Sequence, residues 1–457
     1  MTTTGIDSTG VSVAEWEDLD RRHVIHPHQS GASPQRTVVV RGAGSTVWDA
    51  GGAELLDVSG GGNWAAQVGH GREELVTALA EQASQLAYFS GFFGFTNDKA
   101  VRLAVRLSEL APEGLSRVFF TCGGSEGVET AIKVARLYHH SRGDTDRTWI
   151  ISRQLAYHGA TYGSGTATGF APMHVGIGPN LPHVEKVSAP YPYRADDFYG
   201  GQDTTEFLLT ELAETIERLG ADNIAAMIGE PVMGGGGILT PPPDYWPRVR
   251  ELLSAHGILL IADEVVTAFG RTGTWFDSAA RGMRPDMIVT AKGLTSGYAP
   301  LGAVLIRDDI GEAVAGEGAY FFHGHTYSAH PTACAVALAN LDLIEQDGLL
   351  GRAKEIGEWF AELLAPLAEL PVVGDIRVEG ATAGIELVAD KATREPIMAG
   401  AVTTELREAH GVILRDYGPT LVLSPPLVLR RDEAERAVSA IAEVLGRLGT
   451  DGKVTGA

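Results

Sequence analysis

The chain has 457 residues, 44% hydrophobic and 21% charged, which predicts a globular protein with a large core and more than one domain. Its formal net charge of −22 at pH 7 argues against a nucleic acid partner, because no run of basic residues offsets the repulsion from phosphates. The chain has two cysteines, no basic-then-apolar leader and no apolar run of membrane-spanning length, so we expect a cytoplasmic protein with no membrane partner.

The first part of the chain predicts a small leading unit. Residues 1–11 are polar and rich in Gly and Thr, and we expect them to be flexible. A short helix is predicted over residues 13–23, and glycines divide residues 36–58 into a meander of three strands. Three glycines then precede Trp64, whose ring either packs in the core or lines a pocket.

A strand, a glycine-rich turn and a helix open the larger domain, after two helices between residues 72 and 110. The strand covers residues 117–121, and Gly124 and Ser125 lead into a helix with one apolar face. Unpaired backbone N–H groups and the helix dipole make such a turn a phosphate site. A Gly-Ser pair before a helix is also an ordinary N-cap, so the turn leaves both interpretations open.

Strands and helices alternate from about residue 115 to residue 340, which predicts a mostly parallel sheet with helices on both faces. Tyr157 and His158 lie in the loop after one predicted strand, where an aromatic ring could stack on a planar cofactor. Glu230 ends another strand. Residues 170–201 are rich in Pro, Gly and Tyr, and we expect a long ordered loop there, lying over the site.

Two strands deliver an acid and an amine to the same edge of this sheet. The apolar run at residues 258–262 ends at Asp263, and a second run at 287–289 leads into Lys292. Ligands of open α/β sheets lie beyond the carboxyl ends of the strands, so both side chains can meet one molecule. A Lys that forms a Schiff base and an Asp that keeps a pyridine nitrogen protonated are the pair that a pyridoxal phosphate enzyme needs.

The carboxyl-terminal part predicts a small α+β unit after a long helix at residues 332–346. Arg415 follows an apolar strand in it, and a guanidinium there could bind a carboxylate through paired hydrogen bonds. Three histidines, His323, His325 and His330, raise the alternative of a metal site. They lack helical i, i+4 spacing and have no acidic neighbour in the sequence, so we predict no metal.

Taken together, these segments closely resemble the class III, or omega-amino acid, aminotransferases of pyridoxal phosphate fold type I, from about residue 19 to residue 448. The most specific motifs are ADEVVTAFGRTG at 262–273 and AKGLTSGYAPLGA at 291–303, supported by CGGSEGVETAIKVAR, YHGAT and HTYSAHPTACAVAL. The segment EPVMGGGGILTPPPDYW is most similar to the pyruvate-dependent branch that handles taurine, β-alanine and other ω-amines.

The resemblance implies an α/β fold in two domains. A large pyridoxal phosphate domain, residues 66–335, would hold a mostly parallel seven-stranded sheet. A smaller α+β domain would combine the amino-terminal segment 12–65 with the carboxyl-terminal segment 336–448, followed by a flexible tail at 449–457.

The resemblance also implies a role for each candidate residue. Lys292 would form the Schiff base and transfer protons, and Asp263 would pair with the pyridinium nitrogen. Arg415 would grip the acceptor carboxylate and swing away for donors without one. Residues with cofactor or pocket roles would be Tyr157 and Val265 on the ring, Gly124 and Ser125 on the phosphate, His158 and Glu230 near the cofactor, and Trp64 in the substrate pocket. Thr326 would reach the phosphate of a neighbouring subunit, which implies a homodimer with shared sites, alone or paired into a homotetramer.

The predicted activity is ping-pong transamination from an omega-amino acid or amine to a keto acid, with pyruvate as the expected acceptor. The alternatives are a 2-oxoglutarate-dependent aminotransferase, an aminomutase or a decarboxylating aminotransferase on the same scaffold. A cofactor-binding regulator ranks last because no basic DNA-reading segment precedes the domain. The family's RGxG pattern appears here as Arg377, Val378, Glu379 and Gly380. The charge of Glu379 would disfavour dicarboxylates such as 2-oxoglutarate if it lay near the carboxylate site.

Overall fold

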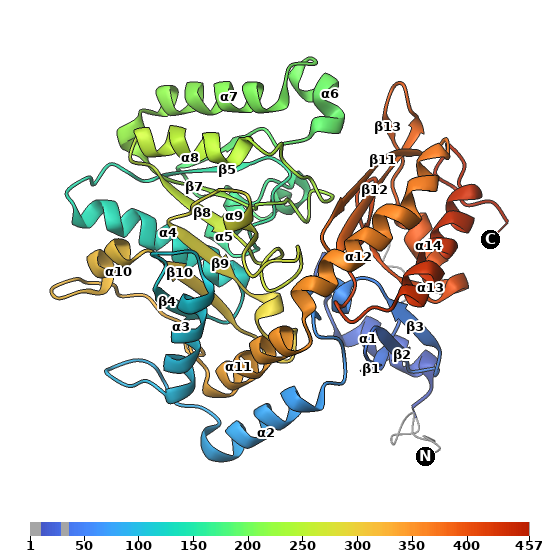
Figure 1. Ribbon diagram of the computed structural model, residues 1–457, viewed down its shortest axis with the longest axis horizontal. Helices are drawn as coiled ribbons and strands as arrows, with labels where there is room; N and C mark the ends of the chain where they lie inside the picture. The colour runs from blue at the N-terminus through green and yellow to red at the C-terminus, as the bar shows by residue number, and fades with distance from the viewer. Residues whose placement is uncertain (1–10, 29–35, 457) are drawn as a thin grey trace.

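The computed structural model describes residues 11–28 and 36–456, and it has two lobes (Figure 1). The prediction of a flexible amino terminus therefore falls almost entirely outside the described residues. Within the described part of the chain, no helix is long and apolar enough to cross a bilayer.

The larger lobe is built on a seven-stranded sheet with the order β4-β10-β9-β8-β7-β5-β6. Every neighbouring pair is parallel except the two that β10 makes with β4 and β9. The strands are β4 (Arg117–Thr121), β5 (Trp149–Arg153), β6 (Val184–Val187), β7 (Ile224–Gly229), β8 (Leu259–Asp263), β9 (Met287–Thr290) and β10 (Gly302–Ile306). This confirms the predicted mostly parallel seven-stranded sheet.

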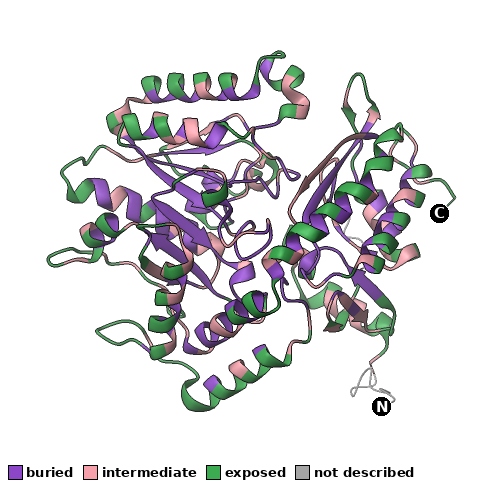
Figure 2. Cartoon of the chain, in the orientation of Figure 1, coloured by how far each residue is buried: buried purple, intermediate pink, exposed green. Residues whose placement is uncertain are grey.

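Helices cover both faces of this sheet, so β7 to β10 are buried along their whole length (Figure 2). Strands buried on both faces carry continuous apolar runs, which is why the sequence pattern located them. The helices of this lobe are α2 (Glu73–Leu86), α3 (Asp98–Leu110), α4 (Gly124–Ser141), α5 (Tyr162–Ala167), α6 (Ala195–Tyr199), α7 (Thr204–Leu219), α8 (Tyr245–Ala255), α9 (Asp277–Ala280), α10 (Asp308–Ala315) and α11 (Pro331–Gln346).

The expectation of an unbroken loop at residues 170–201 is wrong. The segment holds β6, which pairs in parallel with β5 at the edge of the sheet, and the short helix α6. β6 reads Val-Glu-Lys-Val and is only partly buried. An edge strand needs no continuous apolar run, and this one gave no periodic signal for that reason.

The smaller lobe joins the two ends of the chain. The amino-terminal strands β1 (Val39–Ala43), β2 (Thr46–Asp49) and β3 (Glu54–Asp57) form a sheet whose fourth strand is β14 (Val412–Ile413), parallel to β3. This pairing confirms that the amino- and carboxyl-terminal segments build one smaller α+β unit. The other elements are α1 (Val13–His23), α12 (Leu349–Leu364), β11 (Val373–Glu379), β12 (Thr382–Asp390), β13 (Glu395–Pro396), α13 (Gly400–His410), β15 (Arg415–Tyr417), β16 (Thr420–Leu423) and α14 (Arg431–Gly446).

Glu264, directly after β8, anchors the chain that follows this strand. Its fully buried carboxylate accepts hydrogen bonds from the backbone N–H groups of Asp277 (2.7 Å) and Ser278 (2.9 Å), at the start of α9, and from the Thr267 hydroxyl (2.9 Å). Burial, reinforced by the nearby charge of Asp277, raises the pKa of Glu264 to about 7, although the backbone donors oppose the shift.

The pH dependence of stability should report on this carboxylate. Its pKa rises from 4.5 to about 7 on folding, so its contribution to stability is complete below pH 4.5 and is lost as the pH rises through 7. We expect the thermal unfolding midpoint of Glu264→Gln, relative to wild type, to climb over that pH range and to level off above it. The exposed Glu251→Gln on α8 is the matched control, and a difference for Glu264→Gln that does not vary with pH would contradict the assignment.

Candidate active site

A cavity of about 600 Å³ opens where the carboxyl ends of β7, β8 and β9 face the smaller lobe. Most of the residues singled out in the sequence line it: Trp64, Gly124, Ser125, Tyr157, His158, Glu230, Asp263, Val265, Lys292 and Arg415. Thr326 is the exception. Segments more than 300 residues apart in the chain therefore meet around one space.

Lys292 lies on a short turn just after β9, with a backbone φ of 40°. Its Nζ atom lies 4.8 Å from the ring centroid of Trp64. Burial lowers the pKa of Lys292 to about 8, against the opposing charges of Asp263 and Glu230. An amine with such a pKa is partly neutral near physiological pH, and a neutral amine is the nucleophilic form.

Asp263 ends β8 and is 4% exposed. His158 is also buried, and its Nδ1 atom lies 2.7 Å from Oδ2 of Asp263, while the Val265 backbone N–H donates to Oδ1 at 3.2 Å. Among the described residues, Nε2 of His158 has no hydrogen-bond partner. The carboxylate is thus held in a fixed orientation beside the cavity, where it can face a cationic group of a ligand.

Glu230 follows β7 and connects two segments of the cavity wall, one at Tyr157 and one at Gly234. Its carboxylate accepts hydrogen bonds from the backbone N–H groups of Tyr157 (3.1 Å) and Gly234 (2.9 Å). Burial raises its pKa, although the nearby His158 lowers it. Glu230 therefore fixes the segment that carries the Tyr157 ring.

The turn before α4 forms a cradle for an anion. Gly123 is the N-cap of this 18-residue helix, and no side chain caps the helix. A Cβ atom on Gly124 would lie 2.8 Å from Cγ2 of Val265, so a glycine is needed for this close approach. The Ser125 hydroxyl accepts a hydrogen bond from the Ala160 N–H at 3.2 Å. The first N–H groups of α4 and its dipole are available to a phosphate.

Aromatic rings and a guanidinium from the smaller lobe form the opposite wall. Trp64 stacks on Tyr417 with centroids 5.1 Å apart, and Cζ of Arg415 lies 5.3 Å from the Tyr417 centroid. Nη1 of Arg415 donates to the Gly62 carbonyl at 2.8 Å and to Oδ1 of Asn63 at 3.3 Å. Both acceptors are neutral, so the charge of Arg415 remains available to a substrate carboxylate.

Some of the described lining residues lie outside the motifs and candidates recognised in the sequence: Pro27, His28, Asn63 and Tyr417. Tyr417 had a usable signal, because residues two apart on a strand share a face and Arg415 is its neighbour in β15. Asn63 follows the glycine run that was recognised beside Trp64. Pro27 and His28 come from an irregular segment with no periodicity, and only the tertiary fold brings them to the cavity mouth.

Thr326 and other polar residues named in the sequence analysis lie away from the cavity lining. Thr326 is exposed, and its carbonyl accepts a hydrogen bond from the Tyr88 hydroxyl at 2.8 Å. Glu379 is paired with Arg281 at 2.5 Å, so it adds no negative charge to the cavity. His325 lies 3.6 Å from Glu126, an acidic neighbour that the sequence did not reveal. No group of three or more metal-ligating side chains was found across residues 11–28 and 36–456.

The cavity fits pyridoxal phosphate. Asp263 presents a fixed carboxylate for a pyridinium nitrogen, Lys292 presents an amine of lowered pKa for the aldehyde, and the uncapped start of α4 suits the phosphate. Tyr157 and Val265 line the space between these groups, where a flat ring would lie.

The chain belongs to the class III aminotransferases: the family model "Aminotransferase class-III" matches residues 28–445. It is 36% identical to putrescine–pyruvate aminotransferase of Pseudomonas aeruginosa over 96% of this chain and 97% of that protein. It is also 36% identical to diaminobutyrate–2-oxoglutarate transaminase of Halomonas elongata, over 94% and 97% of the two chains. The solved structure of a pyridoxal phosphate-bound amine transaminase from an uncultivated Pseudomonas species matches with a TM-score of 0.90 and 41% identity, over 93% and 99% of the two chains. Pyridoxal phosphate is therefore the cofactor, and amino-group transfer is the class of reaction.

The lowered pKa of Lys292 can be measured without any turnover. In the cofactor-free protein, we expect the acetylation rate of Lys292 to rise with pH around a midpoint of about 8. Exposed lysines should show a midpoint of about 10.4. Trace labelling with acetic anhydride at a series of pH values, read by peptide mass spectrometry, gives both values from one sample. Asp263→Asn should lower the midpoint further, because it removes an opposing charge. A midpoint equal to that of Lys453, whose side chain is 81% exposed, would contradict the assignment.

Proposed function

We propose that the protein is an omega-transaminase that moves an amino group from an omega-amino acid or amine to a keto acid, with pyruvate as the acceptor. One observation carries the proposal: the Lys292 amine of lowered pKa and the Asp263–His158 pair line one cavity with an uncapped helix start. When bound, pyridoxal phosphate supplies an aldehyde that reacts with amines and a ring that accepts electrons.

In this proposal Lys292 is the residue that holds the cofactor and moves the proton of the substrate carbon. Its half-buried side chain and lowered pKa support the role. Asp263, oriented by His158 and by the Val265 N–H, keeps the ring nitrogen protonated. Gly124 and Ser125 bind the phosphate, and Tyr157 and Val265 confine the ring from its two faces. Glu230 holds the Tyr157 segment in place.

The choice of pyruvate is supported by the charges that line the cavity. Within the described lining, Arg415 is the single arginine, and it has neutral partners. One guanidinium suffices for a monocarboxylate, whereas a dicarboxylate leaves a second charge without a partner. The second candidate acceptor is 2-oxoglutarate, because one of the two relatives described above is named for it and the other for pyruvate. Aminomutase and decarboxylating activities find no specific support in the cavity.

We also propose that the active unit is a homodimer, with a pair of dimers as the larger alternative. Aromatic side chains are exposed in the segment of Thr326 and in the loop of Phe93, where the neighbouring Phe92 ring lies against Gly324. Phe93 is 93% exposed, Phe322 88% and Tyr327 60%. An exposed apolar patch of this kind marks an interaction surface. Thr326 would reach the partner's phosphate from this face, which agrees with its absence from the cavity of its own chain.

A cytoplasmic location stays our proposal for this enzyme. Cys122 and Cys334 are both free thiols in the fold. Unpaired cysteines are typical of a reducing compartment. Fractionation of the native host would test it.

An absorbance spectrum tests cofactor, half-reactions and acceptor together. We expect the purified protein to show a visible band of bound cofactor that bleaches on addition of β-alanine, taurine or putrescine and returns on addition of pyruvate. Lys292→Ala should abolish turnover while leaving a folded protein, because the amine that moves the proton is gone. Recovery of the band with 2-oxoglutarate and not with pyruvate would favour the second candidate. Full activity of Lys292→Ala would refute the assigned role.

Arg415 should control the affinity for the acceptor. Hydrogen bonds to a charged group contribute about 1.5–3 kcal/mol, so Arg415→Gln should raise the KM for pyruvate at least tenfold. The KM of an amine donor without a carboxylate should change little, because no such charge pair forms with it. The exposed Arg436→Gln is the control for loss of a surface charge. An unchanged KM for pyruvate would move the carboxylate role to another residue.

A further inference from the structure

A glycine turn between β7 and α8 separates the cavity from the sheet of the smaller lobe. It spans residues 234–237 and closes through a hydrogen bond from the Gly237 N–H to the Gly234 carbonyl at 3.0 Å. Gly235 lines the cavity, and a Cβ atom there would lie 3.3 Å from both Cβ of Tyr157 and the Phe170 ring. This part of the cavity wall therefore consists of backbone without side chains. The position of the turn determines how much space a substrate group has beside Tyr157.

The turn is held from both sides. On the cavity side, the Gly234 N–H donates to the Glu230 carboxylate at 2.9 Å. On the far side, Nε of Arg377, in β11, donates to the Gly237 carbonyl at 3.0 Å. The contact is close, because a Cβ atom on Gly384 in β12 would lie 2.7 Å from that carbonyl oxygen. The smaller lobe thus meets the turn through the Arg377 guanidinium, through Gly384 and through the Thr420 side chain, whose Oγ1 would lie 2.9 Å from a Cβ atom on Gly237.

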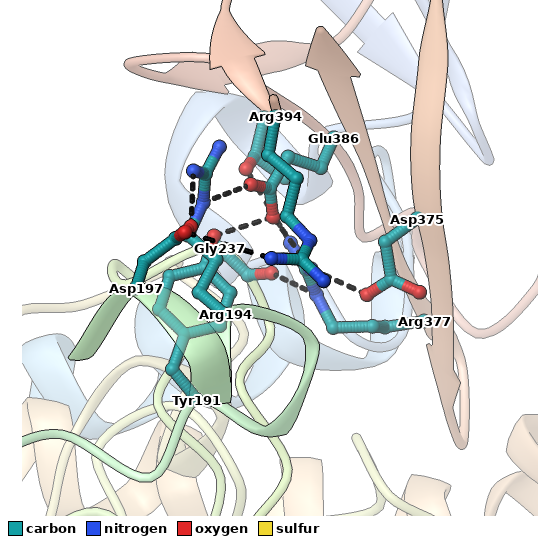
Figure 3. A network of polar contacts seen from close by, with 9 residues as sticks. Tyr191, Arg194, Asp197, Gly237, Asp375, Arg377, Glu386 and Arg394 are labelled. Atoms are coloured by element: carbon teal, nitrogen blue, oxygen red, sulfur yellow. Dashed lines mark hydrogen bonds and ion pairs between the residues drawn. The ribbon is translucent and has the colours of Figure 1, made fainter. Parts of the chain in front are cut away.

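Arg377 is itself fixed by a polar network that joins the lobes (Figure 3). Its Nη1 atom donates to Asp375 at 2.7 Å and to Glu386 at 2.8 Å. Glu386 is fully buried, and it also accepts from Nε of Arg194 at 2.7 Å and from the Tyr191 hydroxyl. A buried carboxylate with three donors leaves Arg377 little freedom, because breaking the Arg377–Glu386 pair would leave a buried charge without a partner.

We propose that Arg377, held by Glu386, is a positioning residue that fixes the glycine turn and so limits the size of the group that a donor amine can place beside Tyr157. Arg377 does not line the cavity, so it acts through the turn and not by touching the substrate. The inference rests on the proposed function for its substrate, an amine, and on geometry alone for the link between Arg377 and the turn.

The test compares Arg377→Lys with wild type as the pyridoxal phosphate-loaded enzyme. Lysine keeps the charge beside Glu386, but one ammonium cannot serve Gly237, Asp375 and Glu386 in the geometry of the guanidinium fork. We expect amide hydrogen exchange over residues 233–239 to quicken about 3- to 10-fold, as for the loss of one hydrogen bond. The ratio of kcat/KM for 1-phenylethylamine over sec-butylamine should rise by a similar factor, because a looser wall admits the larger group. Glu386→Gln should act in the same direction.

Arg394→Lys is the matched control. Arg394 also crosses between the lobes, to Asp196 at 2.7 Å and to Asp197 at 3.5 Å, but it makes no contact with the glycine turn. It should change neither the exchange over 233–239 nor the amine ratio, so general weakening of the lobe contact is separated from loss of the turn.

Three results would overturn the proposal: wild-type exchange rates in Arg377→Lys, faster exchange with an unchanged amine ratio, or the same change of ratio in Arg394→Lys. Failure of the proposed function has a different signature, since wild type itself would then turn over neither amine. The exchange comparison would still decide whether Arg377 holds the turn.

Discussion

The structure depends on keeping an amine and two buried carboxylates together at one edge of the sheet. Asp263 is the last residue of β8, and Glu230 and Lys292 follow the two neighbouring strands β7 and β9, so the topology itself brings the charges together. Moving one such charge out of water costs several kcal/mol, and a neighbour of opposite sign recovers part of that cost. The compromise leaves the Lys292 pKa near 8, between that of a solvated amine and that of an isolated buried one. The same constraint explains why His158, Tyr157 and Gly234 all donate to these carboxylates.

The reversed strand β10 also serves this arrangement. Because it runs antiparallel to β4 and β9, its first residues lie at the edge where the other strands end. Pro300 and Leu301, just before β10, therefore line the cavity between the amine on β9 and the anion cradle beyond β4. One reversed strand thus supplies an apolar spacer between two polar parts of the site.

The sequence was most informative where a reactive side chain lies at the carboxyl end of a buried strand. Asp263 and Lys292 could be located because each follows a continuous apolar run, which is typical of strands buried on both faces. The same logic fails at β6, a partly buried edge strand, and at Pro27 and His28, which reach the cavity only through the folding of remote segments. The Arg377–Glu386 pair was equally hidden. Its members lie on adjacent strands of the smaller lobe, but their hydrogen-bond partners Gly237 and Arg194 belong to the other lobe.

The two lobes supply different groups to the cavity: reactive groups come from the larger lobe and substrate-facing groups from the smaller lobe. The larger lobe supplies the amine, the acid and the anion cradle, while Trp64, Arg415 and Tyr417 of the smaller lobe face them. The net charge of −22 explains why a positive charge is needed inside the cavity. A negative surface attracts cationic amines and repels keto acids, but salt screens this field beyond about 8 Å. Recognition of an anionic acceptor must therefore come from a charge inside the cavity. Arg415 can provide this charge because its protein partners, Gly62 and Asn63, are neutral and leave the guanidinium charge without a counter-ion.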